Sequence, residues 1–241
     1  MTGTVTEFDW RAFDAVLFDL DGVITPTAEI HEHAWGELFA GFDYTQVDYL
    51  RYIDGKPRYD GVRSFLASRH IELAEGDPSD APGVDTVCAL GNRKNELFNT
   101  ILERDGIVPY PSSAATLDLL AEYDVAAAIV SSSKNARTVL DAAGLGARFE
   151  VVVDGTVAAV QHIAGKPAPD MFTHAAERLG VTPNRAAVVE DAVSGVAAGA
   201  AGGFAVVIGV DRGAGAPALL SHGATFVVAD LADLLPSGAP S

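Results

Sequence analysis

Short apolar segments recur along the chain, and each is followed by residues that favour a turn. They are four to six residues long and rich in aliphatic side chains, which is typical of strands buried on both faces of a sheet. The predicted strands span residues 15–20, 125–130, 150–153, 186–190, 205–210 and 225–228. Helix-like segments lie at 112–123, 134–143, 169–179 and 192–201. This alternation predicts an α/β fold with a parallel sheet and helices on both of its faces.

One long stretch, residues 27–105, breaks the alternation. It contains no apolar segment typical of a buried strand, and it offers helix-like segments at 28–40, 60–68 and 84–103. The sequence therefore predicts a helical domain of residues 27–105, inserted after the first strand of a core made of residues 1–26 and 106–241.

The charge of the chain limits what it can bind. Acidic residues outnumber basic ones by 33 to 16, which gives a net charge of −17. Because nucleic acids and anionic membranes would repel such a chain, we expect neither as a partner. The single cysteine, Cys88, excludes an intrachain disulfide and a zinc site built on thiolates. No apolar run reaches the length of a membrane span and no signal peptide is evident, so we expect a cytoplasmic protein.

Two aspartates follow the first predicted strand. Asp19 and Asp21 lie at or just past its carboxyl end, the edge of an open α/β sheet where ligands bind. Their side chains point the same way if the strand continues through them. Because two adjacent carboxylates repel one another, a divalent cation with oxygen ligands is their natural partner. The alternative is that both residues only cap a turn.

Three further segments carry polar residues that suit the same chemistry. Serines 131–133 precede a helix, where they either help to bind an anion or simply cap the helix. Lys166 lies in a loop stiffened by two prolines, where it either contacts a phosphate or is solvated. Glu190 and Asp191 end another strand, as metal ligands or as acids that complement a helix dipole. The recurrence of such residues at strand ends favours one shared site.

These segments resemble the motifs of the haloacid dehalogenase superfamily. Its four motifs are matched in order by FDLDGV at 18–23, Ser131, Lys166 and Glu190-Asp191. Within the superfamily, DLDGVIT followed by Thr27, Ala28, Glu29 and His31, with SSSKN, GKPAPD and VEDAVSG, is similar to the β-phosphoglucomutase family. The resemblance implies a Rossmann-like parallel-sheet core with an inserted α-helical cap.

The resemblance also implies roles for the motif residues. Asp19 would be the nucleophile that becomes an aspartyl phosphate, and Asp21 would be the general acid and base. Ser131 and Lys166 would hold the oxygens of the transferring phosphoryl group. One Mg²⁺ per chain would be bound by Asp19, the Asp21 carbonyl, Glu190 and Asp191.

In the cap, Gly55-Lys56-Pro57-Arg58 resembles the cap loop of the family, and Arg58 would hold the phosphate that is not being transferred. The family places further residues near the hinge and the substrate: His31, Trp35, Gly55, Lys94, Ser132, Lys134 and Asn135. The alternative to a functional role is that Lys94 is simply solvated and that Trp35 simply belongs to the core of the cap.

Pro26 departs from the family pattern, which usually has Asp between the two threonines. Proline fixes φ, removes an N–H and restricts the residue before it. We therefore expect cap closure, or the release of Asp21 to act, to differ in this chain.

The implied activity is the interconversion of β-D-glucose 1-phosphate and glucose 6-phosphate. A small phosphorylated sugar is then the partner of a monomeric enzyme, and β-glucose 1,6-bisphosphate is both intermediate and primer. Two alternatives stay open. A sugar-phosphate phosphatase would let water attack the same phospho-aspartate, and a non-catalytic sugar-phosphate-binding protein would have kept only the fold.

Overall fold

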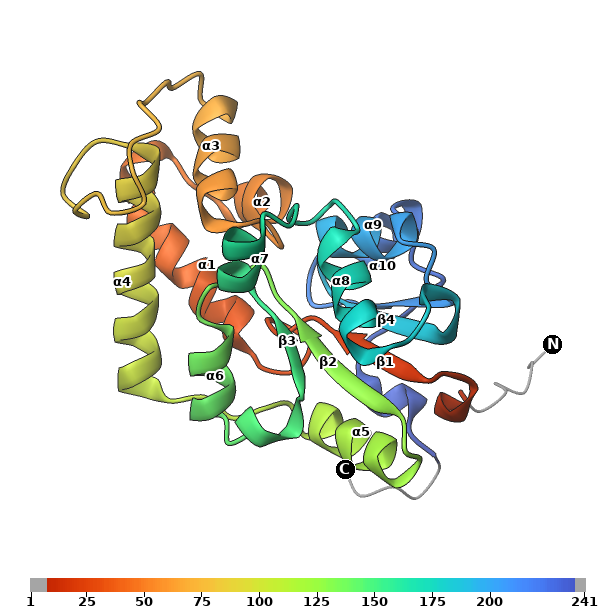
Figure 1. Cartoon of the computed structure of the whole chain (residues 1–241). Coiled ribbons are helices and arrows are strands. Elements are labelled where there is room, and N and C mark those ends of the chain that lie inside the picture. The colour runs from red at the N-terminus through yellow and green to blue at the C-terminus, as the bar shows by residue number, and fades with distance from the viewer. Residues whose placement is uncertain (1–7, 237–241) are drawn as a thin grey trace.

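A six-stranded parallel sheet forms the centre of the protein (Figure 1). The computed structural model describes residues 8–236 of the 241-residue chain. The strand order β3-β2-β1-β4-β5-β6 places the first strand between the second and the fourth. All six predicted strands are confirmed, with no boundary off by more than two residues. They are β1 (Ala15–Phe18), β2 (Ala126–Val130), β3 (Val151–Val153), β4 (Ala186–Glu190), β5 (Val206–Val210) and β6 (Phe226–Val228).

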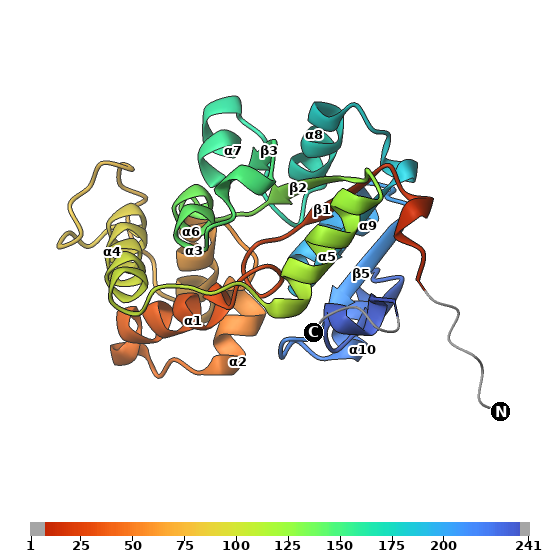
Figure 2. The ribbon, with the colours of Figure 1, turned by 90° about the horizontal axis from the view of Figure 1, so that it is seen from below.

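Helices cover both faces of the sheet because its strands are apolar on both sides. In β1, Val16 and Phe18 pack into one hydrophobic cluster, whereas Ala15 and Leu17 pack into another. The first cluster lies under α5 and α6, and the second lies under α7, α8, α9 and α10 (Figure 2). The bounds are α5 (Pro111–Glu122), α6 (Ala136–Ala142), α7 (Gly155–Gln161), α8 (Asp170–Leu179), α9 (Val193–Ala201) and α10 (Ala216–Ser221).

The helices between residues 27 and 105, called here the cap segment, pack together beside the sheet (Figure 1). Their own hydrophobic cluster centres on Phe39 and Phe65, whose ring centroids lie 4.1 Å apart. Within residues 27–105, all of them described, the structure has no named strand, as the sequence predicts. The elements are α1 (Thr27–Leu38), the 3₁₀ helix η2 (Ala40–Phe42), α2 (Gln46–Asp48), the π-helix η3 (Tyr49–Ile53), α3 (Arg58–Ser68) and α4 (Val87–Asp105).

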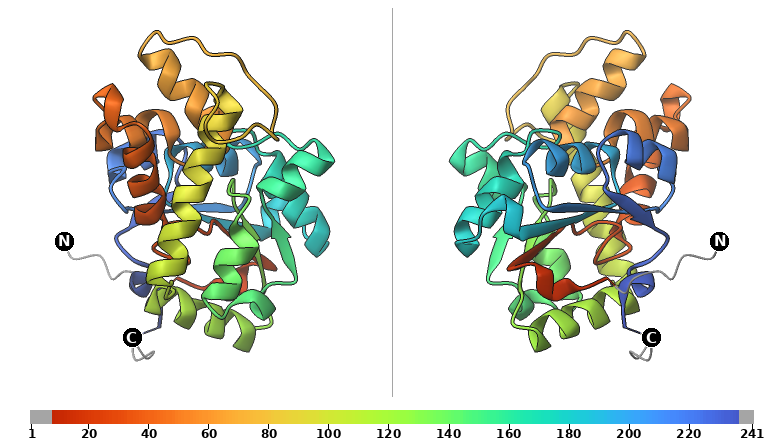
Figure 3. Two further views of the ribbon diagram at one scale, coloured as in Figure 1. Left: turned by 90° about the vertical axis from the view of Figure 1, so that its left-hand side faces the viewer. Right: turned by 90° about the vertical axis from the view of Figure 1, so that its right-hand side faces the viewer.

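The chain crosses between sheet and cap segment twice, before α1 and after α4, and the two crossings lie side by side. The amide of Tyr110 in the second crossing donates to the carbonyl of Ile24 in the first, at 3.0 Å. Arg212 contacts both: its Nε donates to the Gly22 carbonyl at 3.0 Å, and its guanidinium carbon lies 4.1 Å from the centre of the Tyr110 ring. Figure 3 (left) shows α4, in yellow, standing in front of the sheet. Both crossings are therefore anchored to the sheet at one place.

Membrane-spanning helices are absent from the described part of the chain, since none combines the necessary length and apolarity.

Phe65 allows the packing of the cap segment to be tested. Its ring is fully buried among Phe39, Phe42 and Tyr44. We expect Phe65→Ala to lower the free energy of unfolding by about 3–5 kcal/mol, because it removes buried apolar surface and leaves a cavity. Urea unfolding followed by circular dichroism measures the loss. Val47→Ala is the control, since Val47 is 68% exposed, and equal effects of the two changes would contradict the packing described.

Candidate active site

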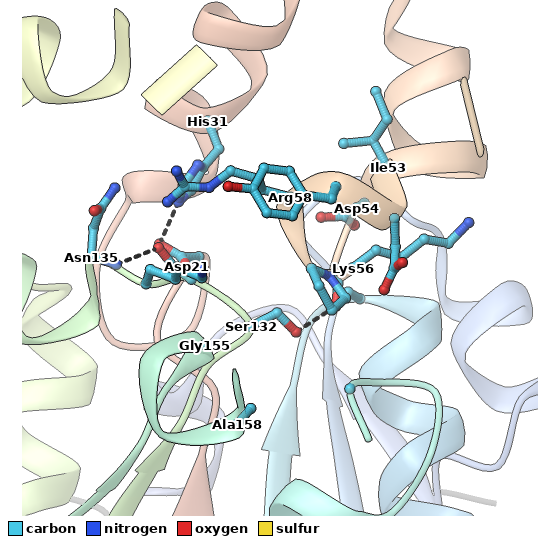
Figure 4. A pocket seen from close by; sticks show the side chains of 18 of the residues that line it. Asp21, His31, Ile53, Asp54, Lys56, Arg58, Ser132, Asn135, Gly155 and Ala158 are labelled. Carbon is cyan, nitrogen blue, oxygen red and sulfur yellow. Dashed lines mark hydrogen bonds and ion pairs between the residues drawn. The ribbon is translucent and has the colours of Figure 1, made fainter. Parts of the chain in front are cut away.

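The cap segment faces the carboxyl edge of the sheet across a cavity of about 420 Å³ (Figure 4). Residues from both sides line it. Eleven of the predicted site residues do so: Asp19, Asp21, His31, Trp35, Gly55, Arg58, Lys94, Ser132, Lys134, Asn135 and Asp191. The other three, Ser131, Lys166 and Glu190, are buried and contact lining residues or one another. The structure thus brings all predicted site residues to one place.

Lys166 is buried between two carboxylates. Its Nζ lies 2.5 Å from Asp19 Oδ1 and 2.5 Å from Glu190 Oε1, and it donates to the Val130 carbonyl at 2.9 Å. Burial by itself lowers the pKa of Lys166, but the two carboxylates outweigh this effect and raise it, so the lysine stays charged. The alternative of a solvated lysine is wrong, because the residue is 2% exposed.

Asp19, Glu190 and Asp191 form a compact acidic set. One carboxylate oxygen from each residue lies within 4.8 Å of the other two. Burial, together with neighbouring negative charges, raises the pKa of Asp19 and of Asp191 well above the ordinary value. Lys166 supplies one positive charge against three carboxylates, so negative charge is in surplus. A set of oxygen donors with surplus negative charge fits a hard divalent cation such as Mg²⁺.

Two glycines leave the space that carboxylates of the acidic set occupy. Gly22 has a φ of +85°, which disfavours other residues, and a Cβ there would overlap the carboxylate of Asp191. A Cβ on Gly195 would likewise overlap the carboxylate of Glu190. A larger side chain at either position would displace a member of the acidic set. Neither glycine was predicted as a site residue, although Gly22 lies within FDLDGV and Gly195 within VEDAVSG.

Asp21 has different partners from Asp19. Strand β1 ends at Phe18, so the two aspartates do not lie on one continuing strand, as the sequence analysis had considered. Thr27 Oγ1 donates to Asp21 Oδ1, and Ser131 Oγ donates to Asp21 Oδ2 at 3.3 Å. The carboxylate of Asp21 is therefore held from both the cap segment and the sheet.

Lys94 and His31 form a buried chain that leads to Asp21. Lys94 Nζ contacts His31 Nδ1, and His31 Nε2 lies 3.3 Å from Asp21 Oδ1. Burial, then the charge of Lys94, lowers the pKa of His31, which favours the neutral ring. An Nδ1 that accepts from lysine leaves the ring proton on Nε2, where it faces Asp21. Burial favours a neutral Asp21, but His31, Thr27 and Lys94 outweigh it and lower the pKa of Asp21 to about 2.

The two alternatives for cap residues have different outcomes. Lys94 is 4% exposed, so the alternative of a solvated lysine is wrong. Trp35 belongs to the hydrophobic cluster of the cap segment and also lines the cavity, with Lys94 Nζ 5.3 Å from its ring centre. Trp35 is therefore both a core residue and a wall of the cavity.

A second polar cluster joins the cap segment to the loop after β2. Asn95 Oδ1 accepts from Arg58 at 3.0 Å and from Asn135 Nδ2 at 2.7 Å. Lys134 Nζ lies 5.4 Å from the centre of the Tyr59 ring. Asn95 was not predicted from the sequence, because a polar residue on a helix carries no signal of what it faces. Asn95 therefore links Arg58 of the cap segment to Asn135 at the sheet edge.

The loop between η3 and α3 docks on the sheet edge. Ser132 Oγ donates to the Gly55 carbonyl at 2.9 Å, and Ser194 Oγ donates to the Asp54 carbonyl at 3.1 Å. Gly55 has a φ of +68°, and a Cβ there would lie 2.9 Å from Ala192 Cβ. Glycine is therefore required at this position by both its conformation and the close approach of the core.

The serines after β2 do not cap the next helix. That helix, α6, begins at Ala136 rather than at 134, and its N-cap, Asn135, makes no side-chain cap. Ser131 Oγ and Ser133 Oγ accept from the amides two residues on, at 3.1 Å each, and so shape the loop. The interpretation of these serines as helix caps is therefore wrong.

The acids Glu190 and Asp191 at the end of β4 do not complement a helix dipole either. Helix α9 begins at Val193 and has no acidic residue in its first turn. Glu190 Oε2 instead accepts from the amide of Ala192 at 3.0 Å, while its other oxygen binds Lys166. Glu190 thus belongs to the acidic set.

Pro26 lies where the chain enters α1. Its φ is −75°, and it provides no side-chain cap for the helix. The flanking hydroxyls of Thr25 and Thr27 are fully buried and lie 2.9 Å apart. The hydroxyl of Thr27, which contacts Asp21, is therefore positioned by a neighbouring threonine on the far side of a rigid proline.

All four lysines of the chain belong to this site. Lys56, Lys94 and Lys134 line the cavity, and Lys166 lies beneath it. In a chain with a net charge of −17, this arrangement concentrates positive charge at the place where an anionic ligand would bind.

Comparison with known proteins agrees with this geometry. The family model "haloacid dehalogenase-like hydrolase" matches residues 13–203. The chain is 49% identical over 239 residues to a β-phosphoglucomutase of Mycobacterium bovis, with 92% of this chain and 91% of that protein covered. It is 34% identical over 225 residues to a β-phosphoglucomutase of Bacillus subtilis, with 91% of each covered. The structure of a β-phosphoglucomutase of Clostridium difficile matches with a TM-score of 0.76 and 24% identity, over 92% of this chain and 93% of that one, which supports the fold.

Lys94 makes stability depend on pH above neutrality. Burial lowers the pKa of Lys94 from 10.5 to about 7 in the folded protein, so between these values the unfolded chain binds more protons. The free energy of unfolding should therefore rise with pH across this window, by up to about 1.4 kcal/mol per pH unit. Lys94→Met should remove the rise in urea unfolding at pH 7, 8 and 9. An unchanged slope in the variant would refute the assignment, and NMR of the four lysine side chains measures the pKa directly.

Proposed function

The chain belongs to the haloacid dehalogenase-like hydrolase family and, within it, to the β-phosphoglucomutases, and we propose that it interconverts β-D-glucose 1-phosphate and glucose 6-phosphate. The supporting observation is one cavity with two distinct polar clusters. Asp19 lies in the acidic set with Lys166, and Arg58 lies with Asn135 in the second cluster. A substrate that carries a phosphate at each end during its conversion needs two such places.

Asp19 is the nucleophile in this proposal. One carboxylate oxygen attacks phosphorus, the bond from phosphorus to the sugar oxygen breaks, and an aspartyl phosphate forms. Lys166 and Ser131 hold the phosphoryl oxygens, and the charge of Lys166 favours the ionised form of Asp19 against the burial that raises its pKa. Mg²⁺, held by Asp19, Glu190, Asp191 and the Asp21 carbonyl, would neutralise charge on the transferring group.

Asp21 moves the proton. While Thr27 and His31 hold it, its lowered pKa keeps it ionised, so it is ready to take a proton from the entering sugar hydroxyl. When the carboxylate leaves these partners, its pKa rises and it can carry that proton. In the opposite direction it gives the proton to the leaving hydroxyl. Pro26 acts here by fixing the backbone next to Thr27.

The second polar cluster holds the phosphate that is not transferred. β-Glucose 1,6-bisphosphate is the intermediate and the primer, and it must bind with either phosphate beside Asp19. Arg58 suits a forked contact with phosphate oxygens, and Lys134 and Asn135 complete the site from the sheet side. Trp35, His31 and Lys94 lie by the sugar. We place the reaction in the cytosol.

Asp19 is the first test of this function. With Mg²⁺, the parent protein should form glucose 6-phosphate from β-glucose 1-phosphate, faster when a trace of the bisphosphate is added. Asp19→Asn should lower kcat by about 1,000-fold or more, because the phosphoryl group loses its acceptor. A coupled glucose 6-phosphate dehydrogenase assay measures this, with phosphate release followed in parallel.

Asp14→Asn is the matched control, because Asp14 pairs with Arg185 on the exposed surface and should keep the parental rate. Phosphate as the main product would establish the phosphatase alternative. Absence of both reactions, together with no Mg²⁺-dependent binding of a fluoride–metal phosphate analogue, would establish the non-catalytic alternative. Full mutase activity in Asp19→Asn would refute the mechanism.

Substitution of Arg58 distinguishes a mutase from a phosphatase. Arg58→Ala should lower mutase kcat/KM by about 30- to 150-fold, which corresponds to the loss of about 2–3 kcal/mol in charged hydrogen bonds. Hydrolysis of p-nitrophenyl phosphate, which has a single phosphate, should persist. Arg11→Ala serves as the control, since the Arg11 side chain is 66% exposed and pairs only with Asp9 among acidic residues of the described chain. Unchanged mutase activity in Arg58→Ala would refute the two-phosphate argument.

A further inference from the structure

Asp54 is a carboxylate of the cap segment that none of the steps above uses. It directly follows η3 and lines the cavity (Figure 4). Asp19 and Asp191 line the same cavity. Asp54 is partly buried, and it was not predicted as a site residue from the sequence. A partly buried acid that lines a cavity together with other acids needs a partner that stabilises its charge.

The backbone around Asp54 is held against the sheet edge. Its amide donates to the Tyr49 carbonyl at 2.9 Å, and its carbonyl accepts from Ser194 Oγ at 3.1 Å. The next residue, Gly55, accepts from Ser132 Oγ at 2.9 Å. Since Ser132 and Ser194 follow β2 and β4, these contacts form only when the cap segment is docked. Docking therefore holds Asp54 at the cavity that Asp19 and Asp191 of the acidic set also line.

The raised pKa values of Asp54 and Asp191 indicate burial and electrostatic repulsion when the loop is docked. Burial, then Glu190 and Asp21, raises the pKa of Asp54 to about 7. In return, Asp54 is the neighbouring charge that contributes most to the raised pKa of Asp191. The docked loop thus adds a fourth carboxylate to three that share the single charge of Lys166. Like charges in a partly buried site repel strongly, unless a cation lies among them.

We propose that Asp54 makes docking of the cap segment depend on the divalent cation of the acidic set. Without the cation, repulsion between Asp54 and Asp191 favours an undocked loop. With it, the same carboxylate is attracted and the serine contacts form. Because such coupling is reciprocal, docking also strengthens binding of the cation. The inference rests on the proposed function in one respect only, that the acidic set binds Mg²⁺.

Asp54 is a positioning residue in this proposal, because it acts on the cap segment and not on the reacting atoms. The consequence is an order of events. The cavity closes fully only after the cation has bound, so a phosphorylated sugar is not enclosed beside an incomplete site. The serine contacts stabilise the docked state whether or not the cation is bound, and the charge of Asp54 decides whether the docked state prevails.

Hydrogen–deuterium exchange of the full chain without substrate tests this proposal. In the parent, 5 mM Mg²⁺ should slow exchange of the peptide that covers residues 49–60 several-fold, whereas NaCl of equal ionic strength should not. Asp54→Asn keeps the size of the side chain and the backbone contacts. In this variant the peptide should already exchange slowly without Mg²⁺, and added Mg²⁺ should change little. Calorimetry should show Mg²⁺ binding weakened by about 5- to 20-fold.

Two further variants sharpen the test. Asp60→Asn removes a carboxylate of the same region that pairs with Arg63, and it should respond to Mg²⁺ as the parent does. Asp54→Glu restores the charge and should restore the dependence on Mg²⁺. If Asp54→Asn shows the parental response, the inference is wrong while the magnesium site stands. If the parent binds no Mg²⁺ in calorimetry, the proposed metal site fails, and this inference fails with it.

Discussion

Carboxylates buried side by side are the constraint on which the rest of this structure depends. The acidic set of Asp19, Glu190 and Asp191 comes from the ends of two strands, so these strands must be neighbours, and the strand order places β1 beside β4. Lys166 reaches between the carboxylates from a third loop. Gly22 lacks the side chain that would fill the space next to them. The strand order, the glycine at position 22 and the buried lysine at position 166 all serve to keep these carboxylates close together.

The core and its edge could be predicted from sequence because both rest on local regularities. Aliphatic runs mark buried strands, and the carboxyl ends of parallel strands meet at one edge. The short helices α7 and α10 were missed because one or two turns carry too few apolar positions to show a period. The π-helix η3 and the contacts of Asn95 with Arg58 and Asn135 were missed for another reason. They depend on how the cap segment sits over the sheet, and no short pattern in the sequence encodes that placement.

The distribution of basic residues follows the same electrostatic logic. Arginines make the exposed ion pairs of the surface, as Arg63 does with Glu75 and Arg185 with Asp14. Lysines are kept for the cavity, where burial changes their properties in opposite directions: the pKa of Lys94 is lowered and that of Lys166 is raised. The difference lies in their partners, since Lys166 contacts two carboxylates and Lys94 contacts a neutral imidazole. A strongly acidic protein thereby keeps a local field suited to anionic ligands.

The adjacency of the two crossings has an evolutionary consequence. Where the chain leaves the sheet and where it returns, Ile24 and Tyr110 are hydrogen-bonded neighbours, and Arg212 contacts both crossings through the Gly22 carbonyl and the Tyr110 ring. An insertion whose ends meet can be exchanged for another of different length without rethreading any strand. Selection can therefore change the cap segment over the cavity, and with it the choice of sugar, while the catalytic residues at the sheet edge are inherited unchanged.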